Sequence, residues 1–338
     1  MRKKVTGVTT SLMLLVALTS SLVLAQGLPI PLIFDDDGSP DGTIALMYVL
    51  RNPAFELKAL TVSCGEAHPT IFAQNLTRVL ARVGHSGIPV AAGRELPLSG
   101  KNEFPGSWRA QSDGFWGLAL PQPVDMVQTL SAAQLIVNVV KASPRPVTLL
   151  VTGTHTNVAE ALRLDRSIAS KIKEIVIMGG ALYIPGNIAS NAPGYTNTVS
   201  EWNIWVDPVA ANEVFASGIP LRLAPLDSTD DVVWTSQDAT TWSGSGTPEG
   251  ALAGEILQML LQWWNPKGIY IWDLDTAVVA SNPGVCPGER LHVDVITAAG
   301  NQQGRTVVRP GESATVSACL RLDSYSVKSA VRAALEQK

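Results

Sequence analysis

Apolar and polar positions follow one another along the chain in blocks that predict strands and helices in turn. A continuous apolar run at 32–34 is typical of a strand that is buried on both faces, and 57–63 and 147–152 predict further strands. Between them, apolar residues recur at helical spacing over 72–83 and 132–140. Strands that alternate with helices form parallel βαβ units, so the pattern predicts an α/β fold with an open, mostly parallel sheet flanked by helices.

Three parts of the chain depart from this alternation. Short strand-like segments at 291–296, 305–308 and 314–320 predict a small antiparallel C-terminal appendage. The stretch 97–123 has no period but carries aromatic residues among Gly, Ser and Pro, which indicates either a functional flap over a pocket or a surface loop held by its aromatics. Residues 227–250 are polar and predict another loop.

The N-terminal end has the organisation of an export signal. Basic residues at 2–4 precede an apolar region at 12–24, and small residues follow at the cleavage positions, so we expect a secretory signal peptide over 1–25. An uncleaved membrane anchor is the alternative, but Thr and Ser interrupt the run and it is short for a span. The remainder, 26–338, shows no repeat or linker and predicts one domain, secreted or periplasmic and free of the membrane after cleavage.

Composition narrows the class of ligand. The 338 residues are 46% hydrophobic and 16% charged, which is enough to bury a large core and argues against disorder. The net charge is −4 and no basic stripe occurs, so binding to nucleic acid is not expected. A small-molecule substrate fits this composition, and the sequence leaves open whether the chain forms homo-oligomers.

The three cysteines divide into a pair and a single residue. Cys286 and Cys319 both lie in the C-terminal segment, and in an oxidising compartment they predict a disulfide. Cys64 directly follows a predicted strand, and no sequence typical of a catalytic cysteine surrounds it. We therefore expect a buried thiol at this position.

The stretch PLIFDDDGSPDGTIALMYVL, 31–50, is the strongest candidate for chemistry. Asp35, Asp36, Asp37 and Asp41 occupy a turn between a buried strand and an apolar helix. Such a turn lies at the carboxyl end of a strand, where ligands bind in α/β sheets, and crowded carboxylates favour a cation such as calcium or magnesium. An acidic surface turn in which Asp41 caps the helix is the alternative.

Further polar groups follow later strands. A Thr-Gly turn comes after 147–152, and Met-Gly-Gly ends the strand 174–178. The segment 181–205 carries amide and carboxylate side chains in place of an apolar repeat, and such side chains can hydrogen-bond the hydroxyls of a sugar. A second acidic point enters a helix within 269–278.

In this order, these features resemble the inosine-uridine-preferring nucleoside hydrolase family, and the resemblance covers most of the mature chain. It implies a nucleoside-hydrolase-like, Rossmann-like fold and hydrolysis of the N-glycosidic bond of ribonucleosides, with calcium holding the 2′ and 3′ hydroxyls of the ribose. Asp35, Asp37 and Asp41 match the first three acidic positions of the family signature Asp-x-Asp-Pro-Gly-x-Asp-Asp. The resemblance implies Asp37, Asp41, Asp273 and the Thr152 carbonyl as metal ligands, Asp37 as the catalytic base, and Asp41, Met178, Asn187, Glu201, Asn203 and Trp272 as substrate contacts.

Gly42 departs from the family pattern, and Trp272 indicates which substrate the resemblance implies. Gly42 stands where the family has its fourth acidic residue, so the metal site is one carboxylate short unless Asp41 or Asp36 compensates. Trp272 stands before the late Asp273, where pyrimidine-tolerant members carry a histidine and purine-specific members a tryptophan. The resemblance therefore implies a purine nucleoside as the substrate.

Two other functions compete with this hypothesis. A nucleoside- or sugar-binding protein of the same fold, inactive because of Gly42, would bind calcium without releasing base. The run Asp35-Asp36-Asp37-Gly38 is also similar to the opening of haloacid-dehalogenase-type phosphatases. Those enzymes need a later lysine and an acidic pair at strand ends, and Lys171, Lys173 and Asp230-Asp231 do not stand in that context.

Overall fold

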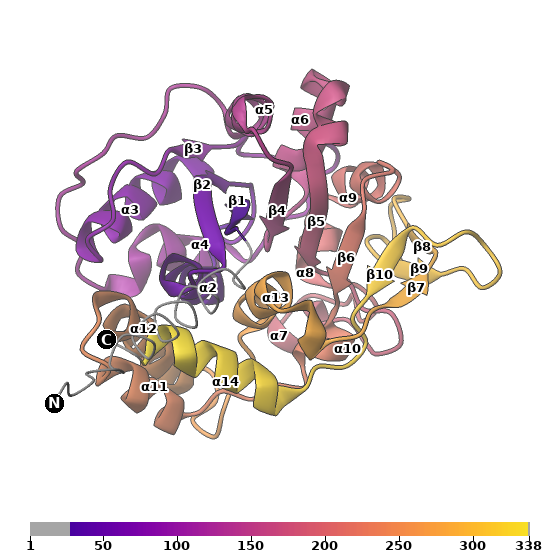
Figure 1. The fold of residues 1–338 in the computed structure, drawn as a ribbon. Helices are drawn as coiled ribbons and strands as arrows, with labels where there is room; N and C mark the ends of the chain where they lie inside the picture. The colour runs from indigo at the N-terminus through magenta and orange to yellow at the C-terminus, as the bar shows by residue number, and fades with distance from the viewer. Residues whose placement is uncertain (1–27, 337–338) are drawn as a thin grey trace, which may run out of the picture.

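The computed structural model describes residues 28–336, which are organised around a mostly parallel sheet (Figure 1). The strand order is β3-β2-β1-β4-β5-β6-β10-β7, and only β7 runs antiparallel to its neighbour. The predicted α/β sheet is thus confirmed. The strands of this sheet are β1 (Ile30–Asp36), β2 (Phe55–Val62), β3 (Val90–Ala92), β4 (Val147–Val151), β5 (Ile172–Met178), β6 (Leu221–Ala224), β7 (Glu289–Leu291) and β10 (Val316–Ala318).

Helices cover both faces of the sheet, because successive residues of a buried strand point to opposite sides. Leu32 and Phe34 of β1 pack into one apolar cluster, and Ile33 packs into the other. The first cluster is covered by α2 (Pro40–Arg51), α3 (Pro69–Arg82), α11 (Ser236–Ser243), α12 (Pro248–Trp263), α13 (Trp272–Ser281) and α14 (Ser324–Leu335). The second is covered by α5 (Ala132–Ala142), α6 (Thr156–Leu164) and α9 (Pro208–Phe215).

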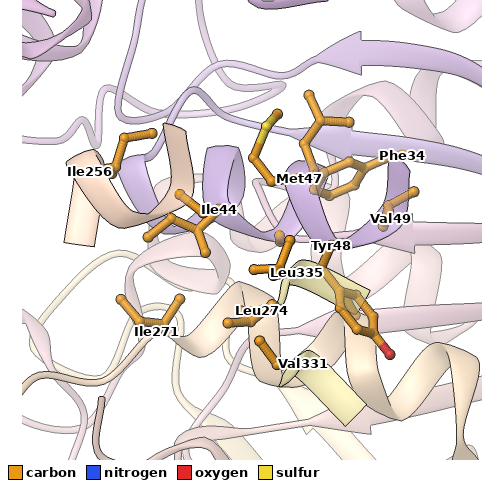
Figure 2. Close-up of a cluster of buried hydrophobic side chains, with 14 of the residues drawn as sticks. Phe34, Ile44, Met47, Tyr48, Val49, Ile256, Ile271, Leu274, Val331 and Leu335 are labelled. Atoms are coloured by element: carbon orange, nitrogen blue, oxygen red, sulfur yellow. The ribbon is translucent and has the colours of Figure 1, made fainter. Parts of the chain in front are cut away.

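Helix α2 is buried on nearly every side, which explains its apolar sequence. Figure 2 shows Ile44, Met47 and Tyr48 of α2 beside Leu274 of α13 and Leu335 of α14. Burying one such side chain contributes roughly 1.5–3 kcal/mol, so the helix is fixed by several neighbours at once. The acidic turn immediately before it is therefore held on a rigid element.

Segments without an apolar repeat nevertheless contain short helices. The stretch 97–123 contains α4 (Gly106–Asp113) and a 3₁₀ turn at Phe115–Gly117, and 227–250 contains α11 where a loop was expected. Further short helices near the carboxyl edge of the sheet are α7 (Ile188–Asn191), α8 (Trp202–Val206) and α10 (Leu226–Thr229). The remaining 3₁₀ turns are Arg166–Lys171 and Pro283–Val285.

The C-terminal strands divide between two sheets, which corrects part of the prediction. The antiparallel appendage consists of β8 (Val293–Val295) and β9 (Thr306–Val308) alone. Strand β10 instead pairs in parallel with β6 and extends the main sheet, with β7 on its outer edge. The strands β7 to β10 lie side by side in the orange to yellow part of the chain in Figure 1.

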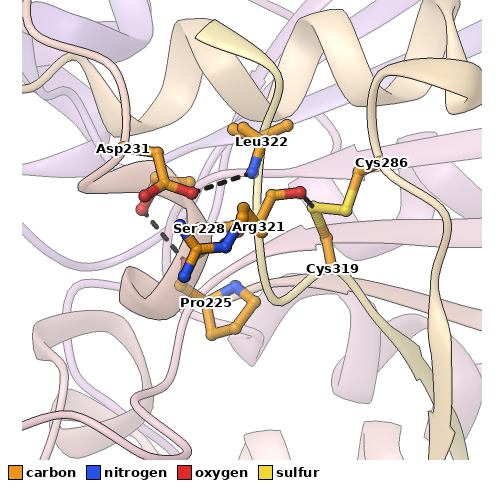
Figure 3. The surroundings of a disulfide bond; sticks show 8 residues. Pro225, Ser228, Asp231, Cys286, Cys319, Arg321 and Leu322 are labelled. Atoms are coloured by element: carbon orange, nitrogen blue, oxygen red, sulfur yellow. Dashed lines mark hydrogen bonds between the residues drawn. A yellow bond between two sulfur atoms is a disulfide. The ribbon is translucent and has the colours of Figure 1, made fainter.

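The disulfide predicted between Cys286 and Cys319 is present, with an S–S distance of 2.06 Å (Figure 3). It joins the segment after α13 to the end of β10, and the Leu322 amide beside it donates to Asp231 at 2.9 Å. Cys64 is a buried free thiol, as expected. The predicted signal peptide lies outside the described residues, and no helix within 28–336 has the length and apolarity needed to cross a membrane.

Candidate active site

The carboxyl ends of β1, β4 and β5 meet around one narrow cavity of about 40 Å³. Every residue proposed from the sequence as a ligand, base or substrate contact lies in its lining: Asp37, Asp41, Thr152, Met178, Asn187, Glu201, Asn203, Trp272 and Asp273. The cavity is also lined by residues outside that set: Ser39, Glu66, Phe104, Trp108, Asn191, Trp202 and Trp264.

Two helix N-termini carry the acidic residues at the floor of the cavity. Ser39, not Asp41, is the N-cap of α2: its hydroxyl accepts from the Gly42 amide at 2.9 Å and donates to Asp273 Oδ2 at 3.0 Å. Asp41 in the first turn of α2 accepts from the amide of Asp273, in the first turn of α13, at 3.4 Å. Helix N-termini favour negative charge, which helps to retain two carboxylates here.

Two glycines make room for Asp37. A Cβ atom added at Gly65 would lie 2.4 Å from Asp37 Cβ, and one added at Gly153 would lie 2.7 Å from the same atom. The Glu66 amide donates to Asp37 Oδ2 at 3.2 Å. The glycines after β2 and β4 therefore have a packing reason, since any larger side chain would displace this carboxylate.

The carboxylates around the cavity are crowded and buried, and both effects disfavour their charged form. Burial raises the pKa of Asp37 well above its usual value, and the charges of Asp36 and Glu66 raise it further. Burial likewise raises the pKa of Asp273, with repulsion from Asp41, Asp36 and Asp37 adding to the effect. A cation held among these oxygens would relieve the repulsion.

The donor atoms fit calcium in kind but are not gathered into a closed cluster. Asp37, Asp41 and Asp273 supply carboxylate oxygens and Thr152 a backbone carbonyl at one cavity, and oxygen is the ligand that calcium prefers. Within residues 28–336, no group of three or more His, Cys, Asp or Glu side chains has a spacing ready to hold a metal ion. Mutual repulsion is a physical reason for carboxylates to stay apart.

A network of polar side chains forms the opposite wall. Glu201 is the N-cap of α8 and accepts from the amides of Asn203 at 2.8 Å, Gly180 at 3.0 Å and Ile204 at 3.2 Å. Burial nevertheless raises its pKa to about 7. The Asn203 amide group donates to the Thr152 carbonyl at 2.9 Å, so this wall is tied directly to the end of β4.

The other aspartates of the acidic turn have structural partners. Asp35 accepts from Thr61 at 2.5 Å and from Asn157 at 2.7 Å, and burial raises its pKa to about 7. Asp36 accepts from the Thr152 hydroxyl at 2.8 Å and the Gly38 amide at 2.8 Å. A side chain at Gly42 would overlap the Asp36 carboxylate, so Asp36 occupies the space beside position 42.

Aromatic side chains close the remaining side of the cavity. Trp272 donates its indole N–H to Asp230 at 2.8 Å, which fixes the plane of its ring. Trp108 of α4 packs on Trp264 with ring centroids 5.6 Å apart, so these two rings support each other at the cavity. Trp116, another tryptophan of the stretch 97–123, packs in the core against Phe72 and does not line the cavity.

The residues missed from the sequence come from segments that lack a local signal. Trp264 follows the last residue of α12 and reads as the end of an apolar helix. Glu66 lies in the turn between β2 and α3, and Trp108 lies in the stretch 97–123, which has no apolar repeat. Their position at one cavity depends on tertiary packing and is visible only in the folded structure.

Comparison with known proteins places the chain among enzymes of one kind. A family model described as inosine-uridine preferring nucleoside hydrolase matches residues 32–329. The pyrimidine-specific ribonucleoside hydrolase RihA of Citrobacter koseri is 34% identical over 284 residues, which is 82% of this chain and 88% of the relative. RihA of Escherichia coli K12 is 33% identical over the same shares.

Solved structures share the fold. A purine-preferring ribonucleoside hydrolase from Gardnerella vaginalis superposes with a TM-score of 0.80 at 24% identity, covering 90% of this chain and 98% of the other. An inosine-guanosine nucleoside hydrolase superposes with a TM-score of 0.79 at 22% identity, covering 91% of this chain and 99% of the other. At these identities the likeness concerns the fold alone.

Proposed function

Because this chain belongs to the inosine-uridine preferring nucleoside hydrolase family, and is therefore a hydrolase of the N-glycosyl bonds of ribonucleosides, we propose that its substrates are purine ribonucleosides and that calcium assists the reaction. The observation that carries the proposal is the polarity of the cavity. The lining combines carboxylates and amides with a group of aromatic rings that pack on one another. A nucleoside has the same division, with a polyhydroxylated sugar at one end and a flat base at the other.

The acidic end is where a calcium ion and the ribose would bind. Asp37, Asp41, Asp273 and the Thr152 carbonyl would hold the ion, and the raised pKa values caused by burial and crowding indicate a position that favours positive charge. When bound, such an ion would supply charge that makes a nearby water more acidic. Asp36 lies behind this group and holds the Thr152 hydroxyl, so it positions the residue whose carbonyl we assign to the ion.

Asp37 is the base in this proposal. It lines the cavity, is held by the Glu66 amide, and is confined by Gly65 and Gly153. Burial raises the pKa of its carboxyl, which brings it nearer the working pH at which a general base is most effective. Asp37 would take a proton from the water that attacks the anomeric carbon, while the bond between that carbon and the nucleobase breaks.

The polar wall would orient the sugar. Asp41 and Asn203 are placed to bind ribose hydroxyls, and Asn203 is itself fixed by the Thr152 carbonyl. Glu201 and Asn187 would contact the 5′ side of the ribose. The side-chain oxygen Oδ1 of Asn187 accepts from the backbone amide of Trp202 at 3.2 Å, which leaves the side-chain NH₂ group of Asn187 available. Met178 lies beside Asn203 and fills the apolar face of the sugar site.

The leaving base would stack on Trp272. No acidic hydrogen is available from an indole ring for the leaving nitrogen, so the contribution of Trp272 would come from stacking, which is worth roughly 0.5–1.5 kcal/mol in ordinary contexts. The hydrogen bond to Asp230 holds the ring in one plane. A purine offers the larger stacking face, which is why we assign purines.

Pyrimidine nucleosides are the second candidate substrates. The RihA relatives, 33–34% identical, carry the name pyrimidine-specific, whereas the purine-preferring structures are less similar in sequence. We also propose that the enzyme works outside the cytoplasm after removal of residues 1–25. The Cys286–Cys319 disulfide supports this placement because disulfides persist in oxidising compartments.

Release of free ribose tests the proposal. The mature protein is incubated with inosine, guanosine, adenosine, uridine and cytidine, with calcium and with a chelator. We expect ribose from the purine nucleosides and a loss of rate with the chelator. Efficient cleavage of uridine and cytidine alone would replace the purine assignment, and calcium-bound protein that releases no ribose would instead support a binding protein.

A further inference from the structure

A second cavity continues the active site outward on its aromatic side. It has a volume of about 340 Å³ and shares Asn191, Trp264 and Trp272 with the narrow cavity. We call it the outer groove, lined by these three residues together with Val233, Lys267 and Tyr270, among others. None of the carboxylates at the acidic end of the site reaches its lining.

The lining of the outer groove is aromatic and exposed. Trp264 is 47% exposed, Val233 41% and Tyr270 40%, all large apolar side chains facing one hollow. The Tyr270 ring lies 6.2 Å from the Trp272 ring, with 31° between the planes. Exposed apolar side chains that gather in a hollow mark a ligand-binding surface more often than scattered ones do.

Backbone pairing gives the groove a defined wall. Trp234 and Ile269 form an antiparallel bridge, with N–O distances of 2.8 and 2.9 Å. Helices α11 and α12 lie between these two residues, and the chain returns to the bridge through Gly268, whose φ of 145° is accessible to glycine and strained for other residues. A Cβ at Gly268 would lie 2.5 Å from Val233 Cγ1, so glycine permits the two segments to close on each other. The hollow is therefore a built feature of the fold.

The position of the groove fixes which part of a substrate could reach it. A ribose over Asp37, Asp41 and Asp273 places the base toward Trp272, and the outer groove begins at Trp272 on the side away from the acids. The far edge of the base, opposite its glycosidic nitrogen, would then face Tyr270 and Val233. A substituent on that edge would enter the groove without disturbing the sugar.

We propose that the outer groove binds a flat apolar substituent on the base of the substrate, so that the enzyme accepts purine ribonucleosides enlarged by an aryl group on the exocyclic nitrogen. This inference rests on the function proposed above. The aromatic lining supplies stacking surface, and the exposure of Trp264 and Tyr270 means that a bound ring would remove apolar area from water.

The test compares adenosine with N6-benzyladenosine. We expect kcat/KM for the benzyl compound to equal or exceed that for adenosine. Val233→Asp, which puts a charge into the groove, should lower kcat/KM for the benzyl compound by about tenfold and leave that for adenosine unchanged. Val124→Asp is the matched control, because Val124 is 72% exposed and lines neither cavity. It should change neither value.

The outcomes separate this inference from the proposed function. Turnover of adenosine with poor turnover of the benzyl compound, or equal effects of Val233→Asp on both, would overturn the groove assignment and leave the hydrolase intact. If no purine nucleoside is cleaved, the readout is binding of free N6-benzyladenine, followed by tryptophan fluorescence. Binding tighter than that of adenine and weakened by Val233→Asp would support the groove, and equal binding of the two bases would overturn it.

Discussion

The carboxylate of Asp36 occupies the space into which a side chain at Gly42 would project: a Cβ atom at Gly42 would lie 2.5 Å from Asp36 Cγ and nearer still to Oδ2. The two positions therefore constrain each other. In the nucleoside hydrolase signature an acidic residue stands at position 42, whereas here the buried carboxylate beside this position comes from residue 36. The departure at Gly42 is thus matched by a neighbouring change and does not leave a void.

Gly42→Ala should destabilise the protein by about 1–3 kcal/mol, because the added methyl group overpacks a buried site. In an Asp36→Ala background the same change should cost little, since the overlapping carboxylate is absent. Urea unfolding of the four proteins in this cycle measures the coupling. Gly106→Ala is the control, because nothing lies within 4 Å of a Cβ there. Additive effects of the two changes would show that Asp36 and Gly42 do not share this space.

Asp37→Asn should lower ribose release by about 10²-fold or more, since it removes the proposed base. The fold should be retained, because asparagine has the same shape between Gly65 and Gly153. The unfolding temperature should not fall, as one charge leaves a group of mutually repelling carboxylates. Glu289→Gln, at an exposed edge strand, is the control for a lost carboxylate. Normal turnover by folded Asp37→Asn protein would refute the assigned base.

His155 should make the protein sensitive to acid. Its side chain is fully buried, neither ring nitrogen has a hydrogen-bond partner within residues 28–336, and burial lowers its pKa to about 3. In the unfolded chain His155 binds a proton near pH 6.5, whereas in the folded chain it stays neutral at that pH. The stability that the neutral ring contributes is therefore complete above pH 6.5 and is lost as pH falls toward 3.

The comparison is between wild type and His155→Leu, unfolded in urea at several pH values. Between pH 8 and pH 5, the free energy of unfolding of the wild type should fall by roughly 2 kcal/mol more than that of the variant. The difference between proteins is needed because Asp35 acts with the opposite sign: its pKa of about 7, raised by burial, favours the folded state as pH falls. A difference that does not change with pH would contradict a neutral buried His155.

The Cys286–Cys319 disulfide closes a loop with a sequence separation of 33. Its loss in a Cys286→Ser/Cys319→Ser protein should cost about 3–4 kcal/mol, mostly through the greater freedom of the unfolded chain. Alkylation of the denatured, non-reduced wild type should modify Cys64 alone, which mass analysis can count. Three modified thiols would show that the bridge does not form.

Much of the sheet could be predicted because its strands are buried on both faces. The runs at 32–34 and 147–152 correspond to the middle of β1 and to the whole of β4, and their apolar character needs no partner to be recognised. Helix α4 could not be found this way, since its buried residues are Arg109 and Ser112 and its position depends on tertiary contacts. The parallel pairing of β10 with β6 joins residues almost a hundred positions apart.

Part of the candidate site, like part of the sheet, could be predicted from the sequence. The acidic turn was visible because its aspartates come at the end of a buried strand, and the residues assigned through the resemblance as metal ligands, base or substrate contacts all line one cavity. Trp264 and Glu66 became visible only when the sheet order brought their segments to the same edge. Spacing in the sequence also could not reveal that Asp36 faces Thr152, since the contact spans 116 positions.

Purine preference is the last prediction, and it depends on Trp272. Its ring lines the cavity next to Asp273, and the hydrogen bond to Asp230 holds the ring in place. A site without a general acid should favour the base with the larger stacking face and the more basic ring nitrogen, and stacking that strengthens as the bond breaks raises kcat. Trp272→Ala should therefore lower kcat on inosine by about tenfold while changing the affinity for ribose little.

Trp272→Phe is the matched variant, because it keeps a flat ring and loses the bond to Asp230. It should retain most of the purine rate if stacking is the cause, whereas a loss equal to that of Trp272→Ala would assign the effect to the Asp230 bond. Steady-state kinetics on inosine and uridine, with ribose binding measured separately, distinguishes these cases. Equal kcat/KM for uridine and inosine in the wild type would remove the purine assignment and return Trp272 to a packing role.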